Sequence, residues 1–505
     1  MSDRNYKEIG KSLTLNGFFS EYLPPCFFLD GKTLLNPPPS DCDLIPPYSF
    51  TMSRYNGNDA RRTIFIPEIG SYLAAHFFME DKNVIQELVE YTEADDHSFS
   101  PILDDDNNIV YHEQVYSGVP GTEEVCPPHY IMNIGEKLIR SAGATKVLKL
   151  DISNCYASFY MHMIPAILLG AENAEREYNK FIRDKSDPTI SQTYLKYKKL
   201  DEAIRRQNLN QTNGLLPGIL SSKLIAEAML ARIDEELENE GIHFVRYVDD
   251  YEVFIYNHEE KAVETTFFRI LKKYGFSINT EKTEVIDFPF YISENFEKIL
   301  KSRLSGTLGR EEIIDVFNAF FELEVKGVKG AIRYLLKCFE QETPSFSDLK
   351  LYQAYLMTIM ANNERSLPKA CALLISNNES FPLGEVNKKR VREMLTNHIA
   401  FGHDLEIIWL LYLLIEIGDI SQGDSLITDV VNADIELAHA LLLRRNLLSG
   451  DLISSIISRA KSWLLLYELY ASGSIDEEAF ISRLNLAKNI SMYQRFKRNN
   501  IHFVS

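Results

Sequence analysis

A chain of 505 residues exceeds what one compact core supports, so two or three domains are expected. Its 45% hydrophobic and 25% charged content is typical of a soluble protein, and no stretch reaches the roughly 18 unbroken apolar residues of a membrane span. The formal net charge of −19 argues against an enzyme that grips a long duplex, because such proteins usually present a basic surface to the phosphates.

The cysteines and the first residues of the chain indicate the cellular compartment of the protein. The six cysteines are scattered without the paired spacing of a zinc site, as in cytosolic proteins with free thiols. The first residues lack the charged-then-apolar layout of a signal peptide. We therefore expect a cytoplasmic protein with no membrane attachment.

Residues 1–145 combine loop signals with short regular elements. Prolines at 24–25, 37–39 and 46–47 disfavour helices and central strands in the first 60 residues. A short strand is predicted over residues 63–66, and a helix from about Ser71. We expect an N-terminal segment of mixed structure.

Two further domains are expected after residue 145. In residues 146–295, β-rich segments alternate with amphipathic helices, which predicts an α+β domain. Later apolar positions, beginning with Ile313 and Phe317, recur at helical spacing. We expect residues 300–505 to form an all-α, HEAT-like helical-repeat domain, with the boundary between residues 287 and 311.

Residues 244–256 carry the first chemical signal. Two β-rich runs flank Asp249 and Asp250, which predicts a hairpin with both acids at its turn. Aspartate is common in turns, and a Tyr-x-Asp-Asp string arises by chance in roughly one chain in ten of this length. This string alone is therefore not decisive.

A second predicted strand, residues 146–151, ends in Asp151. If it lies beside the hairpin, Asp151, Asp249 and Asp250 meet at one edge of a sheet. Crowded carboxylates repel one another unless cations lie among them. Two Mg²⁺ ions about 3.5–4 Å apart, shared with substrate phosphates, would satisfy them and suit phosphoryl transfer; Mn²⁺ is the alternative.

Two more segments add to this pattern. Residues 211–218 form a loop of turn-forming residues before a predicted helix over residues 221–237, and such a loop lets backbone approach a base pair or sugar. Residues 276–283 offer a short strand and a turn ending in Lys282. A lysine there could protonate departing pyrophosphate.

In order and spacing these four segments resemble motifs A, B, C and D of reverse transcriptases. The resemblance implies reverse-transcriptase-like fingers and palm, with Asp151 and Asp249 as the main metal ligands. Asp250 and the backbone carbonyl of Ile152 would join them. Tyr156 matches the steric-gate position, where a bulky ring crowds the ribose 2′-hydroxyl and selects deoxynucleotides; a core aromatic is the alternative.

The resemblance extends to nucleotide contacts. Residues 61–67 look like the Arg-x-(Leu/Ile)-x-Ile-Pro strand of bacterial reverse transcriptases, where an arginine contacts the incoming triphosphate. Arg62 matches that position and Arg61 lies beside it; guanidinium groups suit bidentate phosphate contacts. Two solvated surface arginines are the alternative. Gln211 and Gly218 of motif B are also expected at the nucleotide.

Finer similarities point to a subgroup. Residues 151–156, 211–214 and 246–251 resemble the bacterial abortive-infection (Abi) polymerases, and the prophage-encoded P2 type most of all. Those enzymes replace the usual thumb with a helical domain. They synthesise DNA without a template from a protein tyrosine hydroxyl, form homo-oligomers and defend bacteria against phage. The resemblance implies a DNA nucleotidyltransferase that takes dNTPs and becomes covalently attached to its single-stranded DNA product.

The priming tyrosine must reach the metals and then withdraw. Among 26 tyrosines, Tyr6 lies on the terminal segment expected to be a mobile arm; Tyr22, Tyr48 and Tyr55 are alternatives. Motif B departs from the wider family, because Pro217 stands where glutamine is usual. This departure argues against ordinary template contacts at the loop.

Three other functions stay open at this point. A templated reverse transcriptase would share the palm, although no thumb or RNase H segment is recognisable. An RNA polymerase is disfavoured because Tyr156 should reject ribonucleotides. A non-catalytic scaffold or binding protein would be expected to have lost at least one of the three aspartates.

Overall fold

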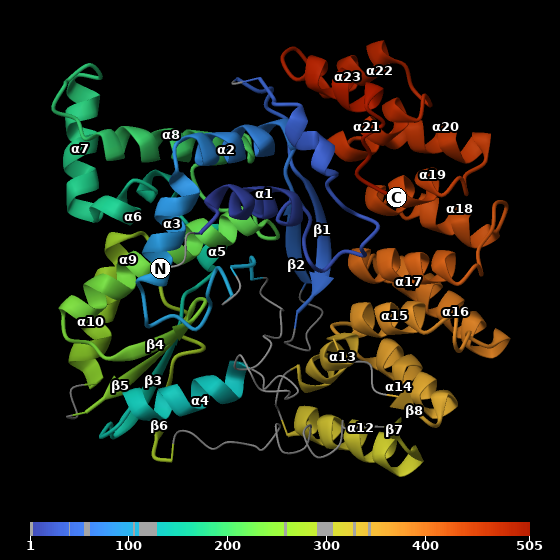
Figure 1. Cartoon of the computed structure of the whole chain (residues 1–505), viewed down its shortest axis with the longest axis horizontal. Helices are drawn as coiled ribbons and strands as arrows, with labels where there is room; N and C mark the ends of the chain where they lie inside the picture. Colours follow the sequence, from blue (N-terminus) through green and yellow to red (C-terminus); the bar gives the residue numbers. More distant parts are fainter. Residues whose placement is uncertain are drawn as a thin grey trace.

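The computed structural model describes residues 4–39, 41–54, 61–104, 107–110, 129–256, 260–289, 307–326, 330–341 and 345–505. An α+β half lies at the left of Figure 1 and a helical half at the right. Strands β1 (Tyr48–Ser53) and β2 (Arg61–Ile66) form an antiparallel ribbon between the two halves.

A four-stranded antiparallel sheet stands at the centre of the α+β half. Its order is β4 (Phe244–Tyr247), β5 (Asp250–Ile255), β3 (Lys146–Asp151) and β6 (Glu284–Asp287). The strand predicted over residues 146–151 and the predicted hairpin are both present. The central strand β3 therefore lies directly beside one arm of that hairpin.

Side chains alternate across the sheet with the period of two that extended backbone imposes. Leu148 and Val253 belong to the core that α9 (Leu220–Asn239) also lines, whereas Val147 and Phe254 form a small cluster on the opposite face. The long, largely buried helix α9 thus supports the sheet from one side.

Shorter helices surround this core. Helix α9 is contacted by α1, α3, α6 and α10, while α2 packs against α8. The described helices of this half, apart from α9, are α1 (Tyr6–Asn16), η1 (Gly31–Leu35), α2 (Ile69–Asp81), α3 (Val84–Glu93), α4 (His129–Arg140), α5 (Cys155–Ser158), η2 (Met161–Met163), α6 (Ala166–Leu169), α7 (Ala171–Arg183), α8 (Gln192–Arg206) and α10 (Glu260–Lys273).

The helical half is a two-layered stack of helices. Its odd-numbered members α13, α15, α17, α19 and α21 contact one another in succession, and the even-numbered ones pack outside them. The described helices are α12 (Arg310–Val325), α13 (Ala331–Gln341), α14 (Leu349–Asn362), α15 (Leu367–Ser376), α16 (Glu385–Phe401), α17 (Asp404–Glu416), α18 (Ser425–Asn432), α19 (Glu436–Arg444), α20 (Gly450–Arg459), α21 (Trp463–Ala471), α22 (Glu477–Leu484) and α23 (Ile490–Arg498).

Two short strands, β7 (Thr307–Leu308) and β8 (Ser345–Phe346), pair in parallel at the start of this half. Among the described residues of this half, this pair and the isolated bridge of Val504 with Phe27 are the exceptions to the predicted all-helical structure. The stacking of successive helices is what an α-solenoid requires, while kinship with HEAT repeats in particular stays a prediction.

The core divides the chain differently from the predicted bounds of 1–145, 146–295 and 300–505. Buried residues from Phe18 to Leu73 share one core with the helical half, whereas most buried residues from Ala75 to Ile278 form the core of the sheet; Leu216 and Ile219 belong to the first core. The last residue also contacts the N-terminal segment, because Ser505 N donates to Cys26 O at 2.9 Å. The apolar face of the β1–β2 ribbon is covered by α17, so the first 73 residues belong structurally to both halves.

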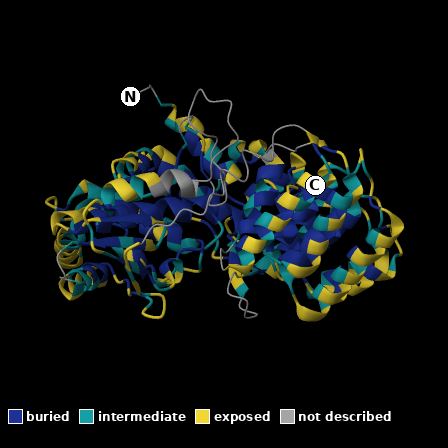
Figure 2. Cartoon of the chain, turned by 90° about the horizontal axis from the view of Figure 1, so that it is seen from below, coloured by how far each residue is buried: buried dark blue, intermediate teal, exposed yellow. Residues whose placement is uncertain are grey.

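Buried positions run through both halves, and exposed ones lie mainly on the outer turns (Figure 2). The most apolar helix of the helical half, α17, lies within the stack and is only 13 residues long. Within the described part of the chain, no helix has the length together with the apolar character that crossing a lipid bilayer demands.

Candidate functional site

Three carboxylates meet at one edge of the sheet. Strand β3 pairs with β5 in the register Asp151↔Asp250, and Asp249 stands in the adjoining turn. One carboxylate oxygen from each of the three lies within 4.8 Å of the others. The predicted convergence of two strand ends almost one hundred residues apart is therefore present.

The turn that carries Asp249 has an unusual backbone. Tyr247 pairs with Asp250, so Val248 and Asp249 form a two-residue hairpin loop. Val248 has φ +56°, in the left-handed region that a β-branched residue rarely adopts. Such strain persists only where surrounding contacts enforce it, and it is frequent at functional sites.

Arg246 supplies those contacts from inside the protein. Its fully buried guanidinium donates to Val248 O at 2.9 Å. The same group is ion-paired with Asp234 at 2.6 Å, Glu227 at 2.9 Å and Asp95 at 3.0 Å. Burial of such a charge is tolerated only when it is paired, so this network fixes the hairpin against α9.

Two of the three carboxylates hold protons more tightly than a free aspartate does. Partial burial, followed by the charge of Asp151, raises the pKa of Asp249. Partial burial, the charge of Asp249 and a hydrogen bond with Asp151 raise the pKa of Asp250 to about 7. A cation among the oxygens would relieve this repulsion, and hard divalent ions prefer such ligands.

Lys282 supplies a positive charge at this edge. Its Nζ lies 2.7 Å from Asp151 Oδ1. The segment that carries it is held by backbone contacts, because Asn279 N donates to Asp151 O at 2.8 Å and Lys282 N donates to Asn279 O at 3.1 Å. Lys282 is therefore placed beside the carboxylates, as a proton donor to the leaving group would have to be.

Ile152 and Tyr156 follow directly from strand β3. Ile152 N donates to Asp249 O at 3.1 Å, so the backbone of Ile152 lies against the hairpin turn. Tyr156, in the short helix α5, packs partly buried against the palm core, and burial raises the pKa of its hydroxyl. The charge of Asp249 raises this pKa further, and that of Arg62 lowers it.

The two adjacent arginines of strand β2 point to opposite faces, as strand geometry requires. Arg62 is exposed, and its charge acts on Asp249 and Tyr156. Arg61 instead forms ion pairs with Glu406 and Glu364 of the helical half. Arg61 as a nucleotide ligand stays a prediction, and its guanidinium is engaged in this contact between the halves.

The loop over residues 211–218 is attached to both the palm and strand β2. Leu215 N donates to Tyr156 O, and Phe65 N donates to Pro217 O, both at 2.9 Å. Gly218 has φ +110°, and a Cβ there would lie 2.5 Å from Ile64 Cγ2. The glycine thus permits close approach to strand β2, and its close approach to a nucleotide stays a prediction.

Gln211 lies in the exposed turn that follows α8, where Asn208 Nδ2 donates to its Oε1 at 3.5 Å. Among the described contacts, none joins Gln211 to the carboxylates, to Tyr156 or to Arg62. Gln211 as a nucleotide contact stays a prediction.

Tyr6 is not on a mobile arm. It opens the helix α1, whose Ile9 and Leu13 are buried, and its hydroxyl donates to Glu90 Oε1 at 3.1 Å. The expected arm is replaced by a packed helix, because α1 presents an apolar face to α3 and α9.

The alternative priming tyrosines are also held in place where they are described. The ring of Tyr22 lies under the guanidinium of Arg365 at 5.7 Å, and its backbone oxygen accepts from Trp409 Nε1 at 2.7 Å. Tyr48 belongs to strand β1 and packs against the core of the helical half. Tyr55 lies outside the described residues.

The buried ion pairs of Arg246 were not predicted from the sequence. A signal was present, since Arg246 interrupts an apolar strand run and Glu227 and Asp234 stand seven residues apart, on one face of the predicted helix. Complementary charges on a buried strand and a buried helix face would have predicted the contact.

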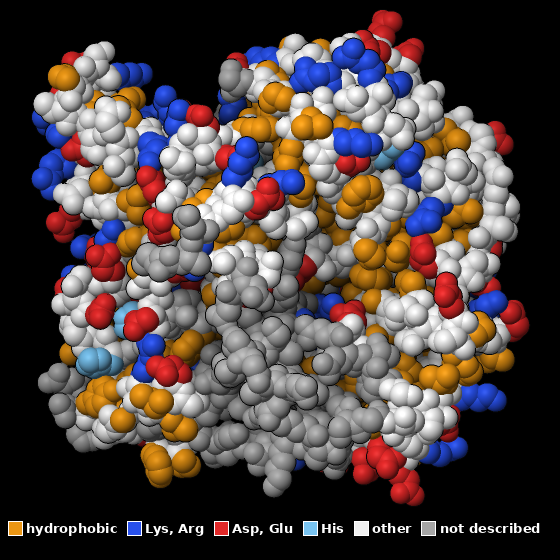
Figure 3. Space-filling view, viewed as in Figure 1, with side chains coloured by type: hydrophobic (Ala, Val, Ile, Leu, Met, Phe, Trp, Pro, Cys, Tyr) orange, Lys and Arg blue, Asp and Glu red, His pale blue; other side chains and the backbone are white. Residues whose placement is uncertain are grey.

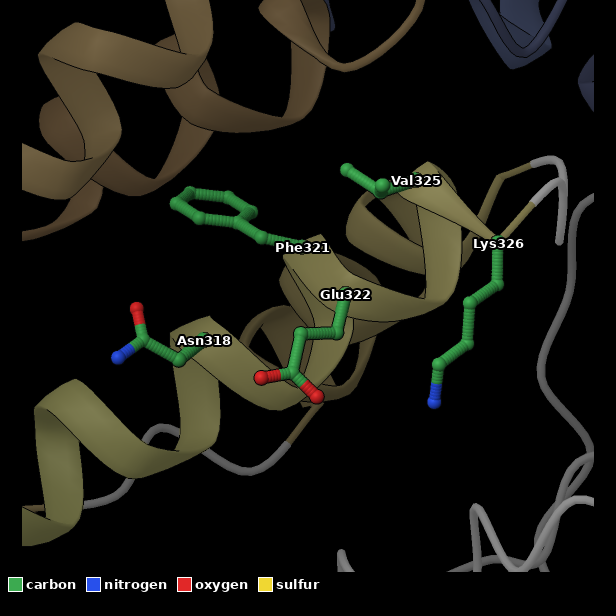
Figure 4. A pocket seen from close by; sticks show the side chains of 5 residues that line it. All are labelled: Asn318, Phe321, Glu322, Val325 and Lys326. Atoms are coloured by element: carbon green, nitrogen blue, oxygen red, sulfur yellow. The ribbon is translucent and has the colours of Figure 1, made fainter.

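A groove elsewhere offers no comparable chemistry. It has a volume of about 310 Å³ and lies along α12, where Phe321 and Val325 project beside Glu322 and Lys326 (Figure 4). Glu322 and Lys326 are solvent-exposed and Val325 is 88% exposed. We assign no function to this groove.

Comparison with known proteins supports the palm. Residues 82–296 match the sequence profile of the reverse transcriptase (RNA-dependent DNA polymerase) family. A search among curated proteins gives no match. The matched residues contain all three aspartates, the loop over residues 211–218 and Lys282, and they end before the helical half.

Similar solved structures are distant. Telomerase from Candida albicans with a telomeric RNA fragment is 12% identical, with a TM-score of 0.29, over 74% of this chain and 66% of that chain. Telomerase from Candida tropicalis, alone and with such a fragment, is 13% and 12% identical with TM-scores of 0.31, over 74% of this chain and 70% and 65% of those chains.

The chain thus spans about two thirds of the length of these telomerases, and at such low scores the likeness transfers no property. The family match and the geometry of the palm do not depend on it. Residues 82–296 therefore resemble the reverse transcriptase family in sequence, and their fold brings the three carboxylates together.

Proposed function

We propose that the protein is a DNA polymerase that needs no template, starts on a tyrosine hydroxyl of its own chain and acts in abortive-infection defence against phage. The meeting of Asp151, Asp249 and Asp250 in a domain of reverse transcriptase type is the observation that carries the assignment as a polymerase. The motif resemblance supports protein priming. The net charge of −19 supports it too, and acidic and basic side chains are interspersed on the face in Figure 3.

The carboxylates suit Mg²⁺, with Mn²⁺ as the alternative, because hard cations take oxygen ligands. A cation would offset both the burial and the mutual repulsion that raise the pKa values of Asp249 and Asp250. Asp151 and Asp249 would be the main ligands, with Asp250 and the carbonyl of Ile152 beside them. Two ions, when bound, stabilise the attacking and leaving oxygens.

In the proposed reaction a hydroxyl oxygen forms a bond to the α-phosphorus of a dNTP, the bond from that phosphorus to the β-phosphate oxygen breaks, and pyrophosphate leaves. The hydroxyl proton passes to solvent, and Lys282 returns a proton to pyrophosphate. Arg62 holds the triphosphate, and Tyr156 crowds the 2′ position of the sugar. The roles of Arg62 and Tyr156 are those that the motif resemblance implies, and the contact of Lys282 with Asp151 supports the role of Lys282.

Incubation of the purified protein with Mg²⁺ and labelled dNTPs, without any nucleic acid, tests this proposal. Label that stays with the polypeptide after denaturation is expected, and Asp249→Asn should abolish it. A wild-type protein that retains no label under these conditions would exclude protein priming. Intact mass after expression in cells should show a ladder of nucleotide additions.

Peptide mapping of the labelled protein identifies the accepting tyrosine. Tyr6→Phe is the sharpest variant for the predicted site, since it removes one hydroxyl and leaves the packing of α1. Unchanged labelling of this variant would remove Tyr6 from consideration and direct the search to Tyr22, Tyr48 and Tyr55.

A templated reverse transcriptase is the second possible function, favoured by the description of the family as RNA-dependent DNA polymerases. It predicts DNA whose sequence mirrors an added RNA. Product whose composition is unaffected by any added RNA would exclude this function.

A non-catalytic scaffold is the third. The helical half, proposed to be a HEAT-like array that assembles homo-oligomers, would then by itself provide the defence against phage. Light scattering of the purified protein measures its oligomeric state. A monomer at micromolar concentration would contradict the proposed assembly. Protection against phage that survives Asp249→Ala would favour the scaffold.

A further inference from the structure

Two histidines of the helical half face each other at the junction with the β1–β2 ribbon. His398 lies in the last turn of α16, and His403 is the residue before α17. Gly402, with φ +66°, reverses the chain between them, and His403 N donates to His398 O at 3.1 Å. This turn brings the two imidazoles together, with Nδ1 of one 3.0 Å from Nδ1 of the other.

A carboxylate from a third segment completes the group. Glu364 lies in the connection between α14 and α15, and its Oε1 is 3.2 Å from His403 Nδ1. The three atoms that could act as ligands lie within 4.8 Å of one another. The contacts of His403 Nδ1 with both other residues show that its ring faces this cluster.

We propose that Glu364, His398 and His403 form a Zn²⁺ site that joins the α14–α15 and α16–α17 connections. Zn²⁺ takes imidazole nitrogen and carboxylate oxygen at about 2.0–2.2 Å, so ligand atoms around one tetrahedral ion lie about 3.3 Å apart. The separations of 3.0 and 3.2 Å agree with that spacing. Two histidines and a carboxylate leave a fourth position for water.

The surroundings of Glu364 fit a metal ligand. Its other oxygen, Oε2, lies 3.4 Å from Arg61 Nη1, so the two carboxylate oxygens serve different partners. A hydrogen-bonded second partner of this kind orients a ligating carboxylate. Glu364 and Glu406 against Arg61 give charges of −2 and +1, a net −1 that attracts a cation.

A bound ion would connect the ribbon to the stack. Arg61 on β2 contacts Glu364 and Glu406, and Thr51 N on β1 donates to Asp404 Oδ2 at 2.8 Å. The ion would therefore restrain the same ribbon that carries Arg62 on its other face. This role is independent of the carboxylates of the palm and of the proposed polymerase function.

Cobalt substitution provides the test, because tetrahedral Co²⁺ absorbs visible light much more strongly than octahedral Co²⁺. The whole chain is titrated with Co²⁺ in excess Mg²⁺, which occupies the palm carboxylates. We expect one Co²⁺ per chain with a tetrahedral spectrum, displaced by one equivalent of Zn²⁺. Bound zinc is counted by elemental mass spectrometry.

His398→Ala and Glu364→Gln should each lower the Zn²⁺ affinity by at least about 100-fold. His162→Ala is the matched control, since His162 is an exposed histidine paired with Asp201 outside the cluster, and its affinity should equal that of the wild type. Circular dichroism confirms that each variant is folded.

The zinc proposal is overturned if the wild-type protein gives no tetrahedral Co²⁺ spectrum, or if it retains less than one zinc ion per chain. The three side chains would then form a hydrogen-bonded network without a metal ion. The metal site is equally excluded if folded His398→Ala and Glu364→Gln bind Zn²⁺ as tightly as the wild type.

Discussion

Arg246 donates from Nη1 to the carbonyl oxygen of Val248, 2.9 Å away, and so supports the turn that presents Asp249. The left-handed backbone of Val248 costs on the order of 1–3 kcal/mol. Because Arg246 also forms ion pairs with three carboxylates, one side chain both ties the hairpin to α9 and supports its turn.

Arg246→Lys should therefore damage turnover more than nucleotide binding. Lysine keeps the charge but loses the planar fork that reaches several acceptors at once. We expect kcat to fall at least about ten-fold with an unchanged KM for dNTP, and the free energy of unfolding to fall by roughly 1–3 kcal/mol. Steady-state incorporation and urea unfolding measure the two effects.

Arg392→Lys is the matched control, since Arg392 forms a similar fork with Asp419 and Asp424 in the helical half. It should lower stability without changing kcat per folded molecule. Equal losses of kcat in the two variants would show that Arg246 acts only through global stability.

The raised pKa of Asp250 predicts how Mg²⁺ dependence varies with pH. Its pKa is about 7 in the folded chain and 3.8 when unperturbed, so the folded state holds the proton more tightly. The stability this group contributes to the metal-free protein is full below pH 4 and is lost as pH rises to about 7. Protons and Mg²⁺ compete for the same oxygens.

Half-saturation with Mg²⁺ should accordingly need less metal as the pH rises from 6 to 8. Asp250→Asn removes the group that binds this proton, so the Mg²⁺ concentration for half-saturation should vary less with pH. Calorimetric titration of Mg²⁺ at several pH values measures it, and the same slope in wild type and Asp250→Asn would assign the dependence to another group.

Tyr156→Ala should relax sugar selection. Removal of the ring opens space beside the 2′ position, and we expect the preference for dNTP over rNTP, as a ratio of kcat/KM values, to fall at least about ten-fold. Tyr156→Phe keeps the ring and should keep the preference. An unchanged ratio in Tyr156→Ala would remove the gate role.

The features that the sequence predicted well are local in origin. The strand ending at Asp151 and the hairpin around Asp249 follow from β-rich runs in which side chains alternate every two residues. The helical half follows from apolar residues that recur every three or four positions. The meeting of these acids needed one further assumption, that β3 lies beside the hairpin, and the register Asp151↔Asp250 satisfies it.

The features that were missed depend on contacts distant in sequence. Ser505 pairs with the backbone of Cys26, and the core around Phe18 belongs to helices more than 300 residues away. No local pattern encodes which apolar face covers another. Tyr6 was expected on an arm for the same reason, since the helix that holds it is stabilised by packing against α3 and α9.

The last prediction concerns Arg61 and Arg62. Side chains alternate along a strand, so the two arginines face opposite sides of the β1–β2 ribbon, but this alternation does not tell which side holds the nucleotide. Arg62→Met should raise the KM for dNTP with little change in stability. Arg61→Met leaves the buried Glu406 without its partner and should cost about 3 kcal/mol of unfolding free energy, with an unchanged KM.

Urea unfolding and steady-state incorporation on the two variants separate these roles. Glu406→Gln combined with Arg61→Met is the informative control, because it removes the uncompensated charge and should restore part of the lost stability. A KM that rises in Arg61→Met as much as in Arg62→Met would mean that both faces of the ribbon serve the nucleotide. The ion pair with Glu406 would then position the ribbon for binding as well as hold the two halves together.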